Sequence, residues 1–346
     1  MYSNHKILFK FDLVIRQNIP HLLKLFFHYF INFIIGVKFV LNNKAKFDIG
    51  FGESNFGGFF IYFLKLIGFV KKTIFMNGDI IPISFRTWDI RNIIQKKIQF
   101  QLRKFAYNNN LIWYTRDEIK VMDRIIGLKS SSVVTIPAVT IVLEELYKNL
   151  LFPDKIYDLA YIGRLDTETG IDLLLQSLAI ARRKNFPKNV IIIGGSEKGI
   201  NRYRQIVKSL NIEDLVVFTG YVKSRTEVME ILRKSMYGFA MYEPKNYNLS
   251  QYTDNGKIKD YIQAGIPVIT TESFNENSKE LKIFGASIEI NFKIEDLADL
   301  FTSDFGIAEK GTINYDMSIN SLKKYSEQYD HIKVFEKLWN EITISL

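Results

Sequence analysis

Apolar and polar positions alternate in blocks along the second half of the chain. Six short apolar runs predict buried strands, at 157–163, 189–195, 215–220, 236–242, 266–270 and 286–290. Between them, apolar residues recur at helical spacing and predict amphipathic helices, at 171–184, 199–210, 225–234, 256–264, 275–283 and 294–302. Strands that alternate with helices predict a parallel sheet covered on both faces, with right-handed crossovers.

The first half shows the same alternation less regularly. Its predicted strands are 7–15, 47–52, 72–77, 110–115 and 133–139, and its predicted helices lie near 20–41, 57–68, 90–107 and 117–126. After about residue 310 the order changes. The residues 321–342 predict one long terminal helix, which we expect to return and pack on the first domain.

The length of 346 residues exceeds what one hydrophobic core usually covers, so two domains are expected. The pattern assigns them to residues 1–142 and 157–320, followed by the return helix at 321–346. The stretch 143–156, with Pro153 near its end, is the predicted linker.

The net charge of +9 is unevenly spread. Residues 1–140 carry 20 Lys and Arg against 8 Asp and Glu, whereas the remainder has a net charge of −3. A basic half favours an anionic partner, either lipid or nucleic acid, and a solvated surface without a partner is the alternative. No nucleic-acid module is recognisable, because the aromatic residues are scattered rather than interleaved with Arg.

Composition narrows the chemistry. The chain has no Cys, which excludes disulfides and thiolate metal sites, and its four His are too dispersed to predict an imidazole metal site. The most apolar stretch, 20–41, is interrupted by Lys24, His28, Asn32 and Lys38, so a membrane span is not expected. A buried helix of the first domain is favoured, with a helix resting in the lipid interface as the alternative.

Two candidate sites lie where predicted strands meet glycines. In "YIGRLDTETGIDLLL" a strand ends at Gly163, Arg164 follows, and Gly170 opens a helix whose free N–H groups favour an anion. In "NVIIIGG" a strand ends at Gly194 and Gly195, which permit close approach of a ligand to the backbone. Ordinary turns are the alternative in both cases.

The third candidate site is the stretch "DNGKIKDYIQAGIPVITTE" (254–272). Helical spacing places Lys257, Asp260 and Tyr261 on neighbouring faces of one helix. An ammonium beside a carboxylate suits a phosphate-plus-sugar ligand, with Lys257 on phosphate and Asp260 accepting from hydroxyl groups. A solvated ion pair is the alternative.

Together these motifs resemble the nucleotide-sugar-dependent glycosyltransferases of the GT-B fold, in particular the family 4 group that builds bacterial surface polysaccharides. The resemblance is strongest over 157–272, where "GKIKDYIQAGIPVI" is the most specific string. It is weaker over 72–140 and faint elsewhere. The resemblance implies an α/β protein with two Rossmann-like domains facing a cleft and a C-terminal helix returning to the first domain.

The resemblance also assigns roles to residues. Asp260 stands where the family has the Glu that bonds the donor ribose, Arg164 binds the donor diphosphate, and Gly194 and Gly195 lie by the base and ribose. The Lys that the family often has before Gly170 is Thr169 here, and Lys257 is the candidate replacement. The further candidate donor-binding residues are Thr169, Gly170, Asp254 and Tyr261.

The acidic residues of the site depart from the family as well. The Glu-x7-Glu pattern of many retaining members would need an acid at Tyr252, and Asp254 and Glu243 are the nearby acids. Glu243 and Asp79 are the candidate catalytic residues, Asp79 as the base. Glu53, Ser54 and Asn55 could line the acceptor side.

The resulting expectation is a hexosyl- or related glycosyltransferase that needs no cofactor or metal. It would move a sugar from a nucleoside-diphosphate sugar to a glycan or lipid-linked acceptor, in capsule or lipopolysaccharide synthesis. The expected location is the cytoplasm, with peripheral attachment to an anionic membrane surface through residues 1–140 and no nucleic-acid partner. The alternatives are a sugar-nucleotide epimerase of the same fold and a catalytically silent, membrane-associated binding relative.

Overall fold

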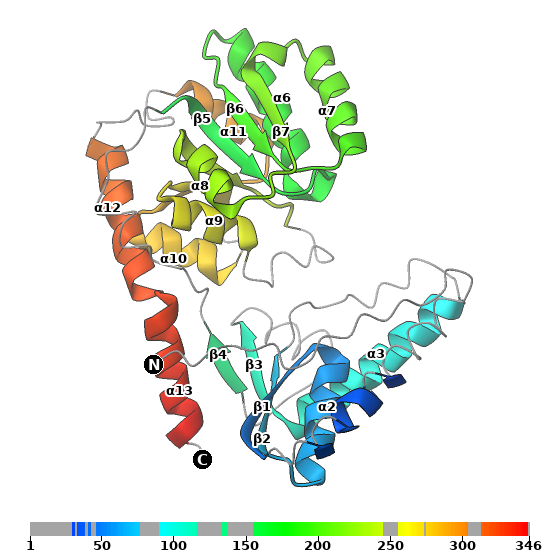
Figure 1. The fold of residues 1–346 in the computed structure, drawn as a ribbon. Coiled ribbons are helices and arrows are strands. Elements are labelled where there is room, and N and C mark those ends of the chain that lie inside the picture. The colour runs from blue at the N-terminus through cyan, green and yellow to red at the C-terminus, as the bar shows by residue number, and fades with distance from the viewer. Residues whose placement is uncertain are drawn as a thin grey trace. The chain divides into compact units, whose positions relative to one another are not determined.

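The structure of the chain is a computed structural model. It describes residues 30–31, 33–38, 41–42, 46–76, 90–115, 133–136, 155–244, 255–272, 275–303 and 313–344. The chain divides into two compact units, coloured blue to cyan and green to red in Figure 1. All described elements from residue 155 onward belong to the second unit.

The first unit is built on a four-stranded sheet in the order β1-β2-β3-β4. Its strands are β1 (Phe47–Glu53), β2 (Val70–Met76), β3 (Leu111–Thr115) and β4 (Val133–Ile136). The β1–β2 and β2–β3 pairs are parallel, and α2 (Ser54–Leu66) packs against β1, β2 and α3 (Ile90–Asn109). The four strands and two helices predicted here are confirmed, and the predicted elements 7–15 and 117–126 lie outside the described residues.

The apolar stretch 20–41 is only partly described, and its described residues from 30 onward are helical. Phe33 packs against the rings of Phe60 and Phe63 in α2, with ring centroids 5.5 and 4.9 Å apart. Ile34 and Leu41, however, are about half exposed. The prediction that this helix is buried is therefore wrong for the side that carries Ile34 and Leu41. None of the helices in the described ranges is both long and apolar enough to cross a membrane.

The second unit contains a six-stranded parallel sheet in the order β10-β9-β8-β5-β6-β7. All six predicted strands are confirmed, as β5 (Tyr157–Ile162), β6 (Val190–Ile193), β7 (Val216–Gly220), β8 (Ser235–Ala240), β9 (Val268–Thr271) and β10 (Ser287–Ile290). The chain runs outward from β5 to β7 and then returns to place β8 on the other side of β5. The sheet order therefore reverses between β5 and β8, and open α/β sheets bind ligands near such a point, at the carboxyl ends of the strands.

Helices cover both faces of this sheet, as predicted. On one face α6 (Ile171–Arg183), α7 (Glu197–Ser209) and α11 (Ile294–Thr302) form a core that includes Leu174, Val207 and Leu297. On the other face lie α8 (Arg225–Arg233), α9 (Gly256–Ala264), α10 (Glu276–Phe284) and α12 (Ile313–Gln328). The layers are visible in Figure 1 on the two sides of β5 and β6. Short 3-10 turns at Thr167–Thr169 and Glu213–Leu215 complete the unit.

Lys155 and Ile156, the last two residues of the predicted linker, already bond to the second unit. The Lys155 ammonium donates to the carbonyl oxygens of Arg233 and Ser235 at 2.8 and 2.7 Å. The Ile156 N–H donates to the Lys234 carbonyl oxygen at 2.8 Å. Residues 143–154 of that stretch lie outside the described residues.

The prediction of one terminal helix is wrong, because two helices occupy this region, α12 and α13 (His331–Ile344). Asp330 separates them: its Oδ1 accepts hydrogen bonds from the N–H groups of Ile332 and Lys333, as a helix N-cap does. Tyr325 of α12 packs edge-on against Phe284 of α10, with ring centroids 5.3 Å apart. The first part of the predicted return helix therefore packs on the second unit, and the return of α13 to the first domain stays a prediction.

Replacing Asp330 with Ala should lower the free energy of unfolding by about 1 kcal/mol, because two N–H groups at the start of α13 lose their acceptor. Asp330→Asn retains an acceptor oxygen and should change it by much less. Urea denaturation followed by circular dichroism measures both variants. Equal stability of Asp330→Ala and the unmodified chain would show that Asp330 does not cap α13.

Candidate functional site

The carboxyl ends of β5, β6 and β7 surround a pocket of about 730 Å³ within the second unit. Four of the predicted site residues meet in its wall: Gly163 and Arg164 after β5, and Gly194 and Gly195 after β6. Two turns that the sequence separates by 30 residues are thus brought together at one edge of the sheet. The remaining lining residues are Ile162, Leu165, Asp166, Ile193, Ser196, Tyr221, Val222 and Val228.

Sequence reasoning missed the wall that follows β7. Tyr221 and Val222 come directly after this strand, and Val228 lies in α8. Tyr221 is 78% exposed, whereas Val228 is buried, so Tyr221 lies at the outer edge of this wall and Val228 in its interior. The signal was available, because Tyr221 and Val222 follow the strand "VVFTG" in the way that Arg164 follows β5.

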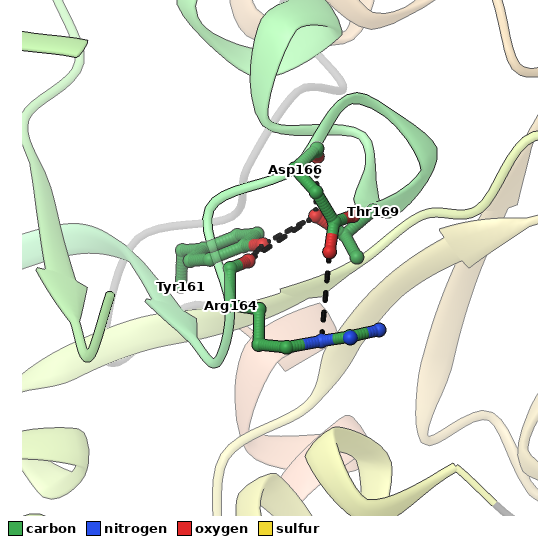
Figure 2. A network of polar contacts seen from close by, with 4 residues as sticks. All are labelled: Tyr161, Arg164, Asp166 and Thr169. Carbon is green, nitrogen blue, oxygen red and sulfur yellow. Dashed lines mark hydrogen bonds and ion pairs between the residues drawn. The ribbon is translucent and has the colours of Figure 1, made fainter. Parts of the chain in front are cut away.

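A network of polar contacts holds the turn after β5 (Figure 2). The Tyr161 hydroxyl donates to the carbonyl oxygen of Arg164 and lies 2.5 Å from the Thr169 hydroxyl, which is 2.7 Å from the Asp166 carbonyl oxygen. Burial raises the pKa of Tyr161, so the phenol stays neutral. Thr169 is buried and holds the turn from inside. Thr169 is predicted to bind the donor, and in the structure its hydroxyl faces Tyr161.

Arg164 points outward from the same turn. Its side chain is 89% exposed, and its Nε lies 3.5 Å from the Asp166 carboxylate, as Figure 2 shows. A guanidinium held at the edge of a pocket by an exposed ion pair can exchange this partner for phosphate oxygens at low energetic cost. Gly170 opens α6 as predicted, with a φ of 74°, but it is not one of the pocket-lining residues.

On α9, Asp260 is bound by an arginine that the sequence analysis did not consider. Arg225, at the start of α8, lies 2.5 Å from the Asp260 carboxylate and 2.6 Å from the Gln263 side-chain oxygen. Burial raises the pKa of Asp260, and the ion pair with Arg225 partly offsets that effect. The predicted ribose acceptor therefore has a competing cationic partner.

Tyr261, which is predicted to bind the donor, has a structural role in the second unit. The side chain is fully buried, and its hydroxyl accepts from the Ile162 N–H at 3.1 Å. The same hydroxyl lies 3.1 Å from the Ala160 carbonyl oxygen and 3.0 Å from that of Phe239. Its ring fills the space above Gly238, where a Cβ atom would lie 2.2 Å from the ring. Tyr261 therefore joins β5 to β8.

Lys257 places its ammonium group over two aromatic rings. The Nζ lies 4.0 Å from the ring centroid of Tyr161 and 5.2 Å from that of Tyr242. The atom is buried and has no hydrogen-bond partner within the described part of the chain. Burial lowers the pKa of Lys257 to about 7, while the nearby Asp166 raises it and Arg164 lowers it further.

The other predicted site residues fall into two groups. Glu243 is half-buried after β8 and is not part of the pocket wall, and Asp79, Asp254 and Tyr252 lie outside the described residues. In the first unit, Glu53 is exposed at the end of β1 and Ser54 begins α2. Asn55, predicted on the acceptor side, is buried, and its Oδ1 accepts from Arg103 of α3 at 3.1 Å. Its described role is thus to tie α2 to α3.

No group of three or more His, Asp and Glu residues that could hold a metal ion occurs within the described ranges. The pocket itself presents a guanidinium, two glycine turns whose backbone is open to close approach, and an apolar wall. These features suit a ligand with an anionic part and a flat apolar part.

The six-stranded parallel sheet with helices on both faces is a Rossmann-like unit of the kind that occurs in the GT-B fold. Solved structures share this fold. A glycosyltransferase from Rickettsia africae is 13% identical, with a TM-score of 0.64 over 96% of this chain and 83% of that one. HepE of Anabaena, solved in complex with UDP and glucose, is 12% identical, with a TM-score of 0.60 over 86% of this chain and 77% of that one. The sucrose-phosphate synthase of Thermosynechococcus elongatus is 13% identical, with a TM-score of 0.60 over 86% and 74%.

A match to a protein family is more specific than the shared fold. Residues 143–243 match the family described as "Glycosyl transferases group 1", and this range holds β5, β6 and β7 and all the residues that line the pocket. No curated protein matches the chain. The family match and the fold together support a glycosyltransferase of the GT-B fold.

Proposed function

We propose that the chain transfers a sugar from a nucleoside-diphosphate sugar, which binds in the pocket after β5, β6 and β7. The observation that carries this proposal is the meeting of Arg164 with the glycine turns at 163 and 194–195 around that pocket, inside the segment that matches the glycosyltransferase family. HepE, which shares the fold, was solved with UDP and glucose, and this supports the same class of ligand here.

The pocket offers each part of such a donor a suitable surface. Arg164 can donate two hydrogen bonds to phosphate oxygens, and the glycines at 163, 194 and 195, which have no side chain, let a ligand approach the backbone closely. Val222 and Val228 provide an apolar wall for the base, and Tyr221 lies beside it at the outer edge. Positive charge near the diphosphate would stabilise it as the leaving group in the transition state, without a metal.

The acceptor is proposed as a glycan or a lipid-linked glycan of surface polysaccharide synthesis, in a capsule or lipopolysaccharide. The basic first half and the exposed apolar residues Ile34 and Leu41 support peripheral attachment to the inner face of the cytoplasmic membrane. Glu53, Asp79 and Glu243 remain the candidates for the acceptor side and the catalytic acid or base. A hexosyl donor is the expected substrate.

A catalytically silent binding relative is the second candidate. It is favoured by the ion pair between Asp260 and Arg225 and by the inward-facing hydroxyl of Thr169, at two positions where the family resemblance implies donor contacts. Product analysis with a panel of donors separates the two functions, because a silent relative binds a nucleotide sugar without consuming it.

The first test is thermal melting in the presence of UDP, GDP, CMP and dTDP. One of these nucleotides should raise the melting temperature, because a ligand at ten times its Kd stabilises the folded state by about 1.4 kcal/mol. The uncomplexed chain at the same ionic strength is the control, since the anions also screen charge. If none of the four changes the melting temperature, the proposed function is wrong.

A further inference from the structure

The most unusual group beside the pocket is the ammonium of Lys257. A buried cation without an acceptor is unfavourable, and two aromatic rings replace only part of the hydration it has lost. The backbone of Lys257 is nevertheless fixed, because the Asn255 side chain caps the start of α9 and accepts a hydrogen bond from the Lys257 N–H at 3.1 Å. The helix thus fixes the backbone of Lys257, while the ammonium has no fixed partner in the described structure.

Gly163 lies next to this ammonium and also lines the pocket. A Cβ atom placed on it would lie 2.9 Å from Lys257 Cε and 3.7 Å from Nζ. The φ of Gly163 is 129°, which L-residues with a side chain rarely adopt. The absence of a side chain at 163 therefore leaves the end of Lys257 next to a residue of the pocket wall.

From this arrangement, and resting on the proposed function, we infer that Lys257 is the second cation for the donor diphosphate. It is stored between Tyr161 and Tyr242 in the free protein and moves past Gly163 onto the phosphates, taking up a proton as the donor binds.

The turn after β5 explains why a cation from another element is needed. The family resemblance implies a Lys before Gly170, but Thr169 stands there and its hydroxyl bonds to Tyr161. Lys257 lies against the ring of the same tyrosine. The turn has no lysine of its own before Gly170, and Lys257 of α9 places an ammonium group beside it instead.

The uptake of a proton follows from the surroundings of the amine. Burial lowers the pKa of Lys257 to about 7, so above that pH the free protein holds the amine mostly neutral. A diphosphate beside it favours the charged form and raises the pKa again. Binding therefore takes up a proton above about pH 7, and the affinity for the donor falls as the pH rises through that range.

Other ionisable groups around Lys257 do not produce this signal. Tyr161 of β5 and Tyr242 after β8 have raised pKa values because they are buried, so both stay neutral. From the turn, Asp166 and Arg164 act on Lys257 with opposite signs. On its own helix, Asp260 is paired with Arg225. The phosphates of a nucleotide sugar are diesters without an ionisation near neutral pH.

The test is isothermal titration calorimetry with UDP-glucose, or with GDP-glucose if GDP gives the larger melting shift. Titrations at about pH 8 in two buffers of different ionisation enthalpy give the number of protons taken up. About 0.9 proton is expected at that pH and about 0.1 at pH 6, from a pKa near 7. The Kd should rise about tenfold per pH unit above roughly pH 7.5.

Lys257→Met, which keeps the length and apolar stem of the side chain, should bind at least tenfold more weakly at about pH 6.5, with no proton uptake and a Kd independent of pH. Its melting temperature should not fall, because the change removes a buried amine without a partner. Lys259→Met on the same helix is the matched control and should keep the proton uptake.

The outcomes separate this inference from the proposed function. Binding by the unmodified chain without proton uptake, or equal binding by Lys257→Met, would overturn the role of Lys257 and leave donor binding in place. Absence of binding by the unmodified chain to either nucleotide sugar would overturn both.

Discussion

Replacing Arg164 with Ala should weaken the binding of the preferred nucleoside diphosphate by roughly ten- to a hundredfold, since a charge-assisted contact to phosphate contributes about 1.5–3 kcal/mol. The stability of the free protein should hardly change, because the side chain is 89% exposed and its ion pair with Asp166 is a surface pair. Calorimetric titration of the variant gives the affinity, and thermal melting of the free variant gives the stability.

Arg182→Ala is the matched control for this experiment. Arg182, at the end of α6, also forms an exposed ion pair, with Asp214, and it is not a pocket-lining residue. It should bind the nucleotide like the unmodified chain. Equal affinity of Arg164→Ala and Arg182→Ala would remove Arg164 from the site. Arg164→Lys should recover part of the affinity, because an ammonium supplies the charge but not the two-pronged geometry.

Tyr261→Ala should lower the free energy of unfolding by about 3–5 kcal/mol, as truncation of a fully buried aromatic side chain does. Tyr261→Phe should lower it by about 1–3 kcal/mol, because the Ile162 N–H and the carbonyl oxygens of Ala160 and Phe239 lose a buried partner. Chemical denaturation of the free proteins measures both changes.

The control is Tyr221→Phe, which removes a hydroxyl from a side chain that is 78% exposed and should leave the stability unchanged. The result also tests whether the role of Tyr261 is structural. A Tyr261→Phe variant that is as stable as the unmodified chain but no longer binds nucleotide would restore Tyr261 to the donor site.

The fold of the second unit could be predicted because its strands are buried on both faces. Such strands appear in the sequence as continuous apolar runs, and the ends of these runs mark the strand ends to within a few residues. Gly163, Arg164, Gly194 and Gly195 follow two of these runs directly. Since parallel strands end at the same edge of a sheet, their meeting around one pocket could be anticipated from the sequence.

The roles on α9 could not be predicted in this way. Helical spacing predicts that Lys257, Asp260 and Tyr261 lie on neighbouring faces of the helix, but not which residues each of them contacts. The Tyr261 ring packs on Gly238, and Asp260 forms an ion pair with Arg225. Gly238 and Arg225 are both distant from α9 in the sequence. Such contacts depend on the packing of one element against another, which local periodicity does not encode.

The prediction of one helix at the end of the chain is wrong for a local reason. Apolar spacing continues from α12 into α13, so periodicity alone predicts one helix. The interruption is caused by Asp330, whose carboxylate accepts from the next N–H groups and begins a new helix. A capping residue within a periodic stretch was the signal to read there.

Tyr261 has a mechanical consequence for the site. The last residues that pair β5 with β8 are Ala160 and Gly238, and beyond them a single phenol spans the gap between the two halves of the sheet. The helix that carries Lys257 and Asp260 is thereby fastened to the strand end that carries Arg164. The backbones of Arg164 and Lys257 are therefore held together by Tyr261, so the loops after β6 and β7 can change in length or sequence and reshape the opposite wall without moving these two backbones apart.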